Sequence, residues 1–140
     1  MTEINIEKVV AYEGAHYQVG TAEISYVLRL GIRCEELANA YDVTGHNCAL
    51  FITAFNPLGT HQSDEANLAA HQRLTTELQK MTPHILEGSG ADPQGNWPAE
   101  RSFLALGIDR ITAELLGHQF QQDAVIWIGI DAVPELVLLR

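Results

Sequence analysis

The distribution of apolar residues along the chain predicts three strands. Residues 22–30 alternate between apolar and polar side chains, which is typical of a half-buried strand. Residues 48–55 and 124–128 are almost continuously apolar and rich in β-branched and aromatic side chains. Runs of this kind favour strands that are covered on both faces, so we expect these two segments to be buried within a sheet.

Two further segments combine a helix start signal with helical spacing. Ser63 is a favourable N-cap, and the helix that follows it is expected to end near Lys80. Its buried stripe is expected to contain Ala70, Leu74, Leu78 and Met81. Asp109 is expected to cap a second helix that ends near Phe120. Weaker patterns predict short helices within residues 3–17 and 34–41, strands at 83–87, 101–108 and 136–139, and a loop rich in Gly and Pro at 88–98.

The order of these elements predicts a fold class. Between residues 48 and 130 the chain reads strand, helix, strand, strand, helix, strand. That order is typical of the ferredoxin-like arrangement. We therefore expect an α+β protein, a two-layer sandwich with a ferredoxin-like βαββαβ core over about residues 48–130 and an additional N-terminal helix and strand and a C-terminal strand. The length of 140 residues suits a single domain spanning residues 1–140.

The expected topology brings polar residues together at one end of the sheet. Right-handed crossovers make the first two strands of the core parallel to each other, and the last two run in the opposite direction. One end of the sheet then collects the last residues of the first pair, the first residues of the second pair and the start of the first helix. The residues expected at this end are Asn56, Asn67, His71, Trp97, Glu100, Ser102 and Gln121.

Most of these residues have both a structural and a functional interpretation. Asn56 directly follows a strand, so its amide either caps the turn or offers a donor and an acceptor to a ligand. Asn67 and His71 lie one turn apart, either as a hydrogen-bonded pair at the helix start or as the rim of a cavity. Gln121 either belongs to a turn that ends a helix or orients a substrate. Trp97 either closes the edge of the core or stacks on a ring of a ligand.

Glu100 is the candidate general acid or base. Glu100 and Ser102 are two positions apart on an extended stretch, so their side chains point to the same side. If that side is inward, the carboxyl group of Glu100 lies near apolar groups, and its pKa rises toward the range useful for proton transfer. If it is outward, Glu100 is one more surface carboxylate of an acidic protein.

The charge balance narrows the range of partners. The chain has 8 Lys and Arg against 18 Asp and Glu, a net charge of −10. Nucleic-acid binding needs a basic face, and anionic membranes attract basic segments, so we expect neither partner. No apolar run approaches the ~20 residues that cross a bilayer. The acidic residues after Met1 do not resemble a signal peptide, so we expect a cytoplasmic protein.

No pattern in the sequence is typical of a cofactor or metal site. Cys34 and Cys48 match no zinc or redox spacing, and His61 and His71 do not have the spacing of metal ligands. The Gly-Ser-Gly at 88–90 is not followed by the Gly-Lys-Ser/Thr of a phosphate loop. We therefore expect no cofactor and no metal, and two free thiols in a reducing compartment.

Four separated segments carry a family resemblance. They are Phe51-Ile-Thr-Ala-Phe-Asn-Pro57, Ser63 with Asn67, Gly88 followed by Trp97, Glu100 and Ser102, and Phe120-x-Gln-x-Ala-Val-Ile126. In this pattern the chain resembles the bacterial domain-of-unknown-function family DUF3293 over roughly its whole length. The resemblance implies a small bacterial cytoplasmic protein and carries no established activity. Two positions depart from the pattern that we expect for the family: Asp123 stands in place of Asn, and His71 in place of Arg or another long residue.

Two functions of different classes fit these observations. The first is a polar small-molecule site, binding or enzymatic, with Glu100 as general acid or base and Trp97 and loop 88–98 as a lid. The ligand contacts expected beside them are Asn56, Asn67, His71, Ser102 and Gln121. The second is an interaction module without catalytic activity. Its edge strand, at 22–30 or 136–139, would pair with a second copy or with a protein partner, and its acidic surface would select a basic one.

Overall fold

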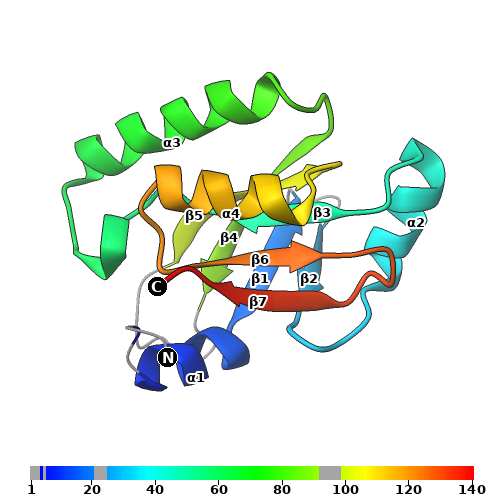
Figure 1. Cartoon of the computed structure of the whole chain (residues 1–140), viewed down its shortest axis with the longest axis horizontal. Helices are drawn as coiled ribbons and strands as arrows, with labels where there is room; N and C mark the ends of the chain where they lie inside the picture. Colours follow the sequence, from blue (N-terminus) through cyan, green and yellow to red (C-terminus); the bar gives the residue numbers. More distant parts are fainter. Residues whose placement is uncertain (1–3, 5, 21–24, 92–98) are drawn as a thin grey trace.

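The chain forms one curled antiparallel sheet with helices on both of its faces (Figure 1). The computed structural model describes residues 4, 6–20, 25–91 and 99–140. Among these residues, seven strands pair in the order β2-β1-β4-β5-β3-β6-β7. The strands are β1 His16–Gly20, β2 Ser25–Leu28, β3 Ala49–Ile52, β4 Ile85–Ala91, β5 Glu100–Leu106, β6 Ala124–Ile128 and β7 Pro134–Leu138. The helices are α1 Ile6–Gly14, α2 Glu35–Thr44, α3 Asp64–Gln79 and α4 Arg110–Gln119, with a 3-10 turn, η1, at Pro57–Gly59.

The two helix starts that the sequence signals predict are confirmed. The hydroxyl oxygen of Ser63 accepts a 3.1 Å hydrogen bond from the amide of Ala66 at the start of α3. The carboxylate of Asp109 accepts one of 2.7 Å from the amide of Thr112 at the start of α4. Each side chain satisfies a backbone donor that the first helical turn leaves without a partner. The prediction that Met81 belongs to the buried stripe of α3 is wrong, because the helix ends at Gln79 and the Met81 side chain is exposed.

The convex face of the sheet packs against α3 and α4. Successive side chains of a strand point to opposite faces, so Leu50 and Ile52 of β3 face these helices while their neighbours face the other side. The buried residues that the helices contribute are Ala70, Leu74 and Leu78 from α3 and Ala113 and Leu116 from α4. This apolar layer fixes α3 and α4 side by side over the middle of the sheet (Figure 1).

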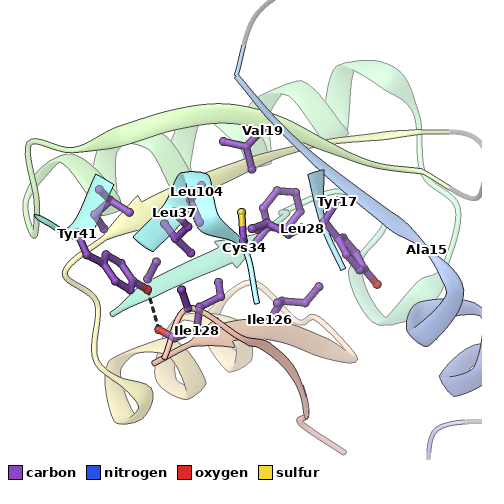
Figure 2. Packing of buried hydrophobic residues seen from close by; sticks show 14 residues of the cluster. Ala15, Tyr17, Val19, Leu28, Cys34, Leu37, Tyr41, Leu104, Ile126 and Ile128 are labelled. Carbon is purple, nitrogen blue, oxygen red and sulfur yellow. Dashed lines mark hydrogen bonds between the residues drawn. The ribbon is translucent and has the colours of Figure 1, made fainter. Parts of the chain in front are cut away.

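The concave face encloses a second core. Figure 2 shows side chains from β1, α2 and β6 pointing toward one another, and the hydroxyl of Tyr41 donates a 3.1 Å hydrogen bond to the carbonyl oxygen of Ile128. The members of this cluster include Tyr17, Val19, Leu28, Cys34, Leu37, Phe51, Leu104 and Ile126. Since β1, β2 and β6 are distant in the strand order yet share one core, the sheet is curled into a half-barrel.

Backbone hydrogen bonds span the open side of the half-barrel. The segment after β2 reaches the beginning of β7, where the amide of Gly31 donates to the carbonyl oxygen of Pro134 at 2.9 Å. The amide of Cys34 donates to the carbonyl oxygen of Ala132, also at 2.9 Å. Backbone acceptors at and just before the start of β7 are therefore already hydrogen-bonded within the chain.

The prediction of a two-layer ferredoxin-like sandwich is wrong, although the protein is α+β as expected. The six elements from β3 to β6 occur in the predicted order, but the sheet has seven strands among the described residues and carries a core on each face. The prediction failed because no strand was expected at β1, which begins at the end of the segment 3–17 expected to contain a helix and ends before the first expected strand at 22–30. The first residues of the expected loop 88–98 also pair with β1, as the end of β4. Gly88 permits this pairing, since a Cβ there would collide with the carbonyl oxygen of Gln18.

Candidate functional site

The strand directions gather the candidate residues at one mouth of the half-barrel. Both β3 and β4 pair antiparallel with β5, so their last residues lie at the end of the sheet where β5 begins with Glu100. The start of β6 lies at the same end, because β6 also pairs antiparallel with β3. Helix α1 lies at this mouth, near the C-terminus (Figure 1), and its Lys8 lines a pocket together with Gly59 of η1. The site is therefore built from segments that are far apart in the sequence.

Asn56 is the centre of an amide network at this end. It has φ 48° and ψ 65°, the left-handed conformation that Asn adopts more readily than most residues. Its backbone amide donates to Oδ1 of Asn67 at 2.8 Å, and Nδ2 of Asn67 donates back to Oδ1 of Asn56 at 3.1 Å. Gln62 completes the network with a backbone bond to Asn56 and a 2.7 Å side-chain bond to Asn67. The start of α3 is thus tied to the turn that follows β3.

The same Asn56 holds the carboxyl group of Glu100. Its Nδ2 donates a 2.8 Å hydrogen bond to Oε2 of Glu100. Burial raises the pKa of Glu100 above its usual value, while the bond from Asn56 and the nearby His61 act in the opposite direction. The sequence allows the side chains of Glu100 and Ser102 to point either inward or outward. In the structure both point inward and line a cavity on the concave side of the sheet. The Ser102 hydroxyl donates to the backbone carbonyl of Glu100 at 3.0 Å.

Helix α1 is fastened over the site by a buried carboxylate. Asp123, with its side chain 2% exposed, forms ion pairs with Lys8 at 3.1 Å and with Arg140 at 2.5 Å. Tyr12, on the same helix, also hydrogen-bonds to Asp123 through its side chain. Burial, followed by the charges of Asp123 and Glu100, raises the pKa of Tyr12 to about 12. The Tyr12 hydroxyl consequently stays protonated at neutral pH.

Two cavities meet at Tyr12 and Glu100, which line both. The inner cavity, of about 80 Å³, lies inside the half-barrel and has Tyr17, Phe51 and Ile126 among its walls. The outer pocket has a volume of about 260 Å³ and is lined by Lys8, Ala11, Tyr12, Asn56, Gly59, His61 and Glu100. The outer pocket contains two charged side chains, Lys8 and Glu100, beside its apolar surface, whereas the walls of the inner cavity are mostly apolar and include Glu100 as their charged group. A carboxyl group therefore stands at the junction of two different environments.

Three of the predicted site residues lie elsewhere or cannot be placed. His71 packs inside the convex core, stacked on Phe103 with ring centroids 4.3 Å apart, and it lines neither cavity. Gln121 lies at the expected end of the sheet, where its backbone has φ 55°. Its exposed side chain, however, borders a separate pocket beside α3 and α4. Trp97 lies outside the described residues, as does most of the loop expected at 88–98.

Several residues of the site were not found by sequence reasoning. Lys8 and Tyr12 belong to a helix without any recognisable motif, and only its docking onto the sheet brings them to Glu100. Gln122, the neighbour of the predicted Gln121, is the one that turns inward, where it donates to the carbonyl oxygen of Phe55 at 3.2 Å. The signal that could have identified Gln122 is the alternation along the start of β6, which places its side chain on the side of the buried Ile126.

The described residues offer neither a metal cluster nor a membrane span. In residues 4, 6–20, 25–91 and 99–140, no three His, Cys, Asp or Glu side chains are grouped so as to hold a metal ion. Within the same residues, none of the helices is long and apolar enough to cross a bilayer. Cys34 and Cys48 are both free thiols.

The fold and the site define the class of protein: a small α+β protein with a pocket at the mouth of an antiparallel half-barrel. The family model described as "Protein of unknown function (DUF3293)" matches residues 52–125, which is more than half of the chain. The chain belongs to the DUF3293 family. The matched segment runs from the end of β3 to the start of β6 and includes Asn56, Asn67 and Glu100. No curated protein and no solved structure matches the chain.

Proposed function

We propose that this protein binds a polar small molecule at the mouth of the half-barrel, with Glu100 as its principal contact. One observation carries the proposal: the carboxyl group of Glu100 lines both cavities and is held there by the side-chain amide of Asn56. Burying a carboxyl group costs free energy unless it is hydrogen-bonded, and evolution tolerates that cost mainly at sites of function. A ligand donor at Glu100 would offset it.

The same group is suited to proton transfer. Its raised pKa brings Glu100 closer to neutrality than an exposed glutamate, which favours general acid–base chemistry. Tyr12 faces the same pocket with a hydroxyl that stays protonated, and Asn56 holds the carboxyl group in one orientation. In a reaction at this site, Glu100 would exchange the proton, and the hydroxyl oxygen of Tyr12, whose proton is directed to Asp123, would accept a hydrogen bond from the substrate.

A ligand screen on three proteins tests the proposal. Thermal denaturation of the wild type is followed with a library of polar metabolites, beside Glu100→Gln and the control Glu135→Gln. Glu135 lies on the exposed face of β7 and pairs with Arg110, outside both cavities. We expect ligands that stabilise the wild type and the control by mass action but not Glu100→Gln. Equal stabilisation of all three proteins would place the binding elsewhere, and the absence of any stabilising ligand would contradict the proposal.

The cellular setting proposed here is the bacterial cytoplasm. It is supported by the resemblance to a bacterial family and by the two free cysteines, which suit a reducing compartment. Fractionation of cells that produce the untagged protein tests this, with recovery in the soluble cytoplasmic fraction as the expected result. Recovery with periplasmic or membrane markers would contradict it.

Partner binding through an edge strand is a second proposal. Strands β2 and β7 are the two ends of the strand order, and β2 has one neighbouring strand among the described residues. Val27 on β2 and Leu138 on β7 are exposed apolar side chains at these edges. The hydrogen bonds from Gly31 and Cys34 leave less of β7 available, so β2 is the better candidate for pairing with a second copy. Sedimentation velocity tests this: a dimer that Val27→Lys dissociates supports it, and a monomer at high concentration contradicts it.

A further inference from the structure

The inner cavity is small, and its walls are more apolar than polar. Apart from Glu100, Ser102, Thr53 and Gln122, its walls are aromatic or aliphatic or, at Gly90, backbone; the edge-to-face pair of Tyr17 and Phe51, with centroids 5.5 Å apart, is among them. An apolar cavity of about 150 Å³ accepts benzene, so a cavity of about 80 Å³ has room for roughly three carbon atoms. The complementary group is therefore a short aliphatic chain, such as an isopropyl group.

The junction of the two cavities selects for a positively charged donor. No other described residue beside Asn56 donates a hydrogen bond to the carboxyl group of Glu100, so it retains capacity to accept. An ammonium group supplies three hydrogen-bond donors, and its positive charge offsets the free-energy cost of burying the negative charge of Glu100. A ligand amine at Glu100 can carry a short apolar group directly into the inner cavity, because Glu100 lines both spaces.

The outer pocket also contains a cationic side chain. Lys8 lines the outer pocket together with Glu100, and its side chain is 42% exposed although it is paired with Asp123. The ammonium of Lys8 lies against Gly59, where a Cβ would collide with it. An ammonium has three donors, and the bond to Asp123 uses one of them. The outer pocket thus contains one anionic and one cationic side chain.

We propose that the ligand is a small aliphatic α-amino acid of about the size of valine, an assignment that rests on the proposed function. Its ammonium group binds Glu100, its carboxylate binds Lys8, and its side chain fills the inner cavity. A zwitterion with a short side chain matches the pocket, because Glu100 and Lys8 have opposite charges and the inner cavity is small. A polyanion does not match it. A phosphorylated ligand would bring two or more negative charges to a pocket in which Lys8 is already shared with Asp123.

Three matched molecules test the assignment by calorimetric titration at pH 7.5. Valine has all three groups, isobutylamine lacks the carboxylate, and isovalerate lacks the amine. We expect valine and isobutylamine to bind the wild type, and isovalerate to bind about tenfold more weakly or not at all, since the lost bond is to a charged group. Glu100→Gln should weaken both amines by about tenfold or more, whereas Glu135→Gln should leave them unchanged.

Lys8→Met separates the contact to the carboxylate from the docking of α1. Valine and isobutylamine both lose the firm docking of α1 in this variant, but only valine also loses the contact to its carboxylate. Valine should therefore weaken by about threefold to tenfold more than isobutylamine does. Isovalerate binding as tightly as isobutylamine would overturn the assignment of the amine. If neither amine binds while another molecule binds in a manner that depends on Glu100, the amino-acid inference falls and the proposed function stands. If no molecule of the screen binds at Glu100, both fall.

Discussion

The side-chain amide of Asn56 donates a 2.8 Å hydrogen bond to Oε2 of Glu100 and so joins the turn after β3 to the first residue of β5. This contact depends on a backbone conformation, because Asn56 has a φ of 48°. The same residue bonds in both directions to Asn67 at the beginning of α3. One asparagine therefore positions the carboxyl group, the turn and the helix relative to one another.

Substitutions at Asn56 should separate the hydrogen bonds from the backbone conformation. Asn56→Gly removes the side-chain amide but suits a positive φ, whereas Asn56→Ala removes the amide and adds the strain of a left-handed alanine. We expect Asn56→Ala to be less stable than Asn56→Gly by about 1–2 kcal/mol. Asn56→Gly should lose about 1–3 kcal/mol relative to the wild type, since it leaves partners unsatisfied. Urea denaturation measures both differences, and equal stability of the two variants would argue against the strained turn.

The raised pKa of Glu100 predicts a specific pH dependence of stability. At this residue a proton binds the folded state more tightly than the unfolded state. The contribution of Glu100 to the free energy of unfolding is therefore fully present below its usual pKa of 4.5. It is lost as the pH rises through the raised pKa of the folded protein. The stability of the wild type should therefore fall relative to Glu100→Gln over this range. The measurement is urea denaturation of both proteins from pH 4 to pH 8, and a constant difference would contradict the burial of the carboxyl group.

The lowered pKa of His71 predicts that the protein loses stability as the pH falls, the opposite of the effect of Glu100. The residue is 5% exposed, and neither ring nitrogen has a hydrogen-bond partner among the described residues. Burial, followed by the nearby charge of Arg101, lowers the pKa of His71 below its usual 6.5, and Glu87 acts in the other direction. Stability from the neutral ring is present above 6.5 and is lost as the pH falls through the lowered pKa.

A ring without nitrogens tests this account of His71. His71→Phe keeps the contact with Phe103 and removes two buried polar atoms, so its stability should equal or exceed that of the wild type by about 1 kcal/mol at neutral pH. Its advantage should grow between pH 6.5 and pH 5 in urea denaturation. A large loss of stability in His71→Phe would show that the imidazole makes a bond that the ring packing does not reveal.

Lys8 should govern how firmly α1 covers the site. Its partner Asp123 is buried, so Lys8→Met should cost about 1–2 kcal/mol and increase amide hydrogen exchange over residues 6–14. The control is Arg33→Met, which removes an exposed ion pair with Glu35 and should cost less than about 0.5 kcal/mol. Exchange in α1 that is as slow in Lys8→Met as in the wild type would mean that this ion pair does not hold the helix.

The elements with strong local signals could be predicted from the sequence. Strands β3 and β6 are continuous apolar runs, and α3 and α4 begin at Ser63 and Asp109, whose side chains cap them. The curvature of the sheet could not be predicted in this way. It depends on β1, a five-residue strand, and on Gly88 of β4, which lets β1 approach. Gly88 indicates a loop by composition and forms part of a strand because of its neighbours.

The candidate site shows the same division. The direction of neighbouring strands gives a physical reason to expect Asn56 and Glu100 at one end, and they are hydrogen-bonded there. The pattern of the sequence could not indicate Lys8 and Tyr12, because their role depends on the docking of α1. It left His71 either as one half of a hydrogen-bonded pair with Asn67 or at the rim of a cavity, whereas the structure has it stacked on Phe103 in the convex core. A helix face that is apolar below and polar above does not tell whether its last polar residue is inside the core.

Chemical-shift mapping tests most directly whether the pocket at Glu100 binds a small molecule. Spectra of the labelled protein are recorded with increasing valine and, in parallel, with the strongest ligand of the metabolite screen. The account predicts saturable shifts concentrated at the side-chain amide of Asn56 and the backbone amides of Tyr12, Glu100 and Ser102, and absent in Glu100→Gln. Shifts that are scattered over the surface, or that persist unchanged in Glu100→Gln, would contradict it.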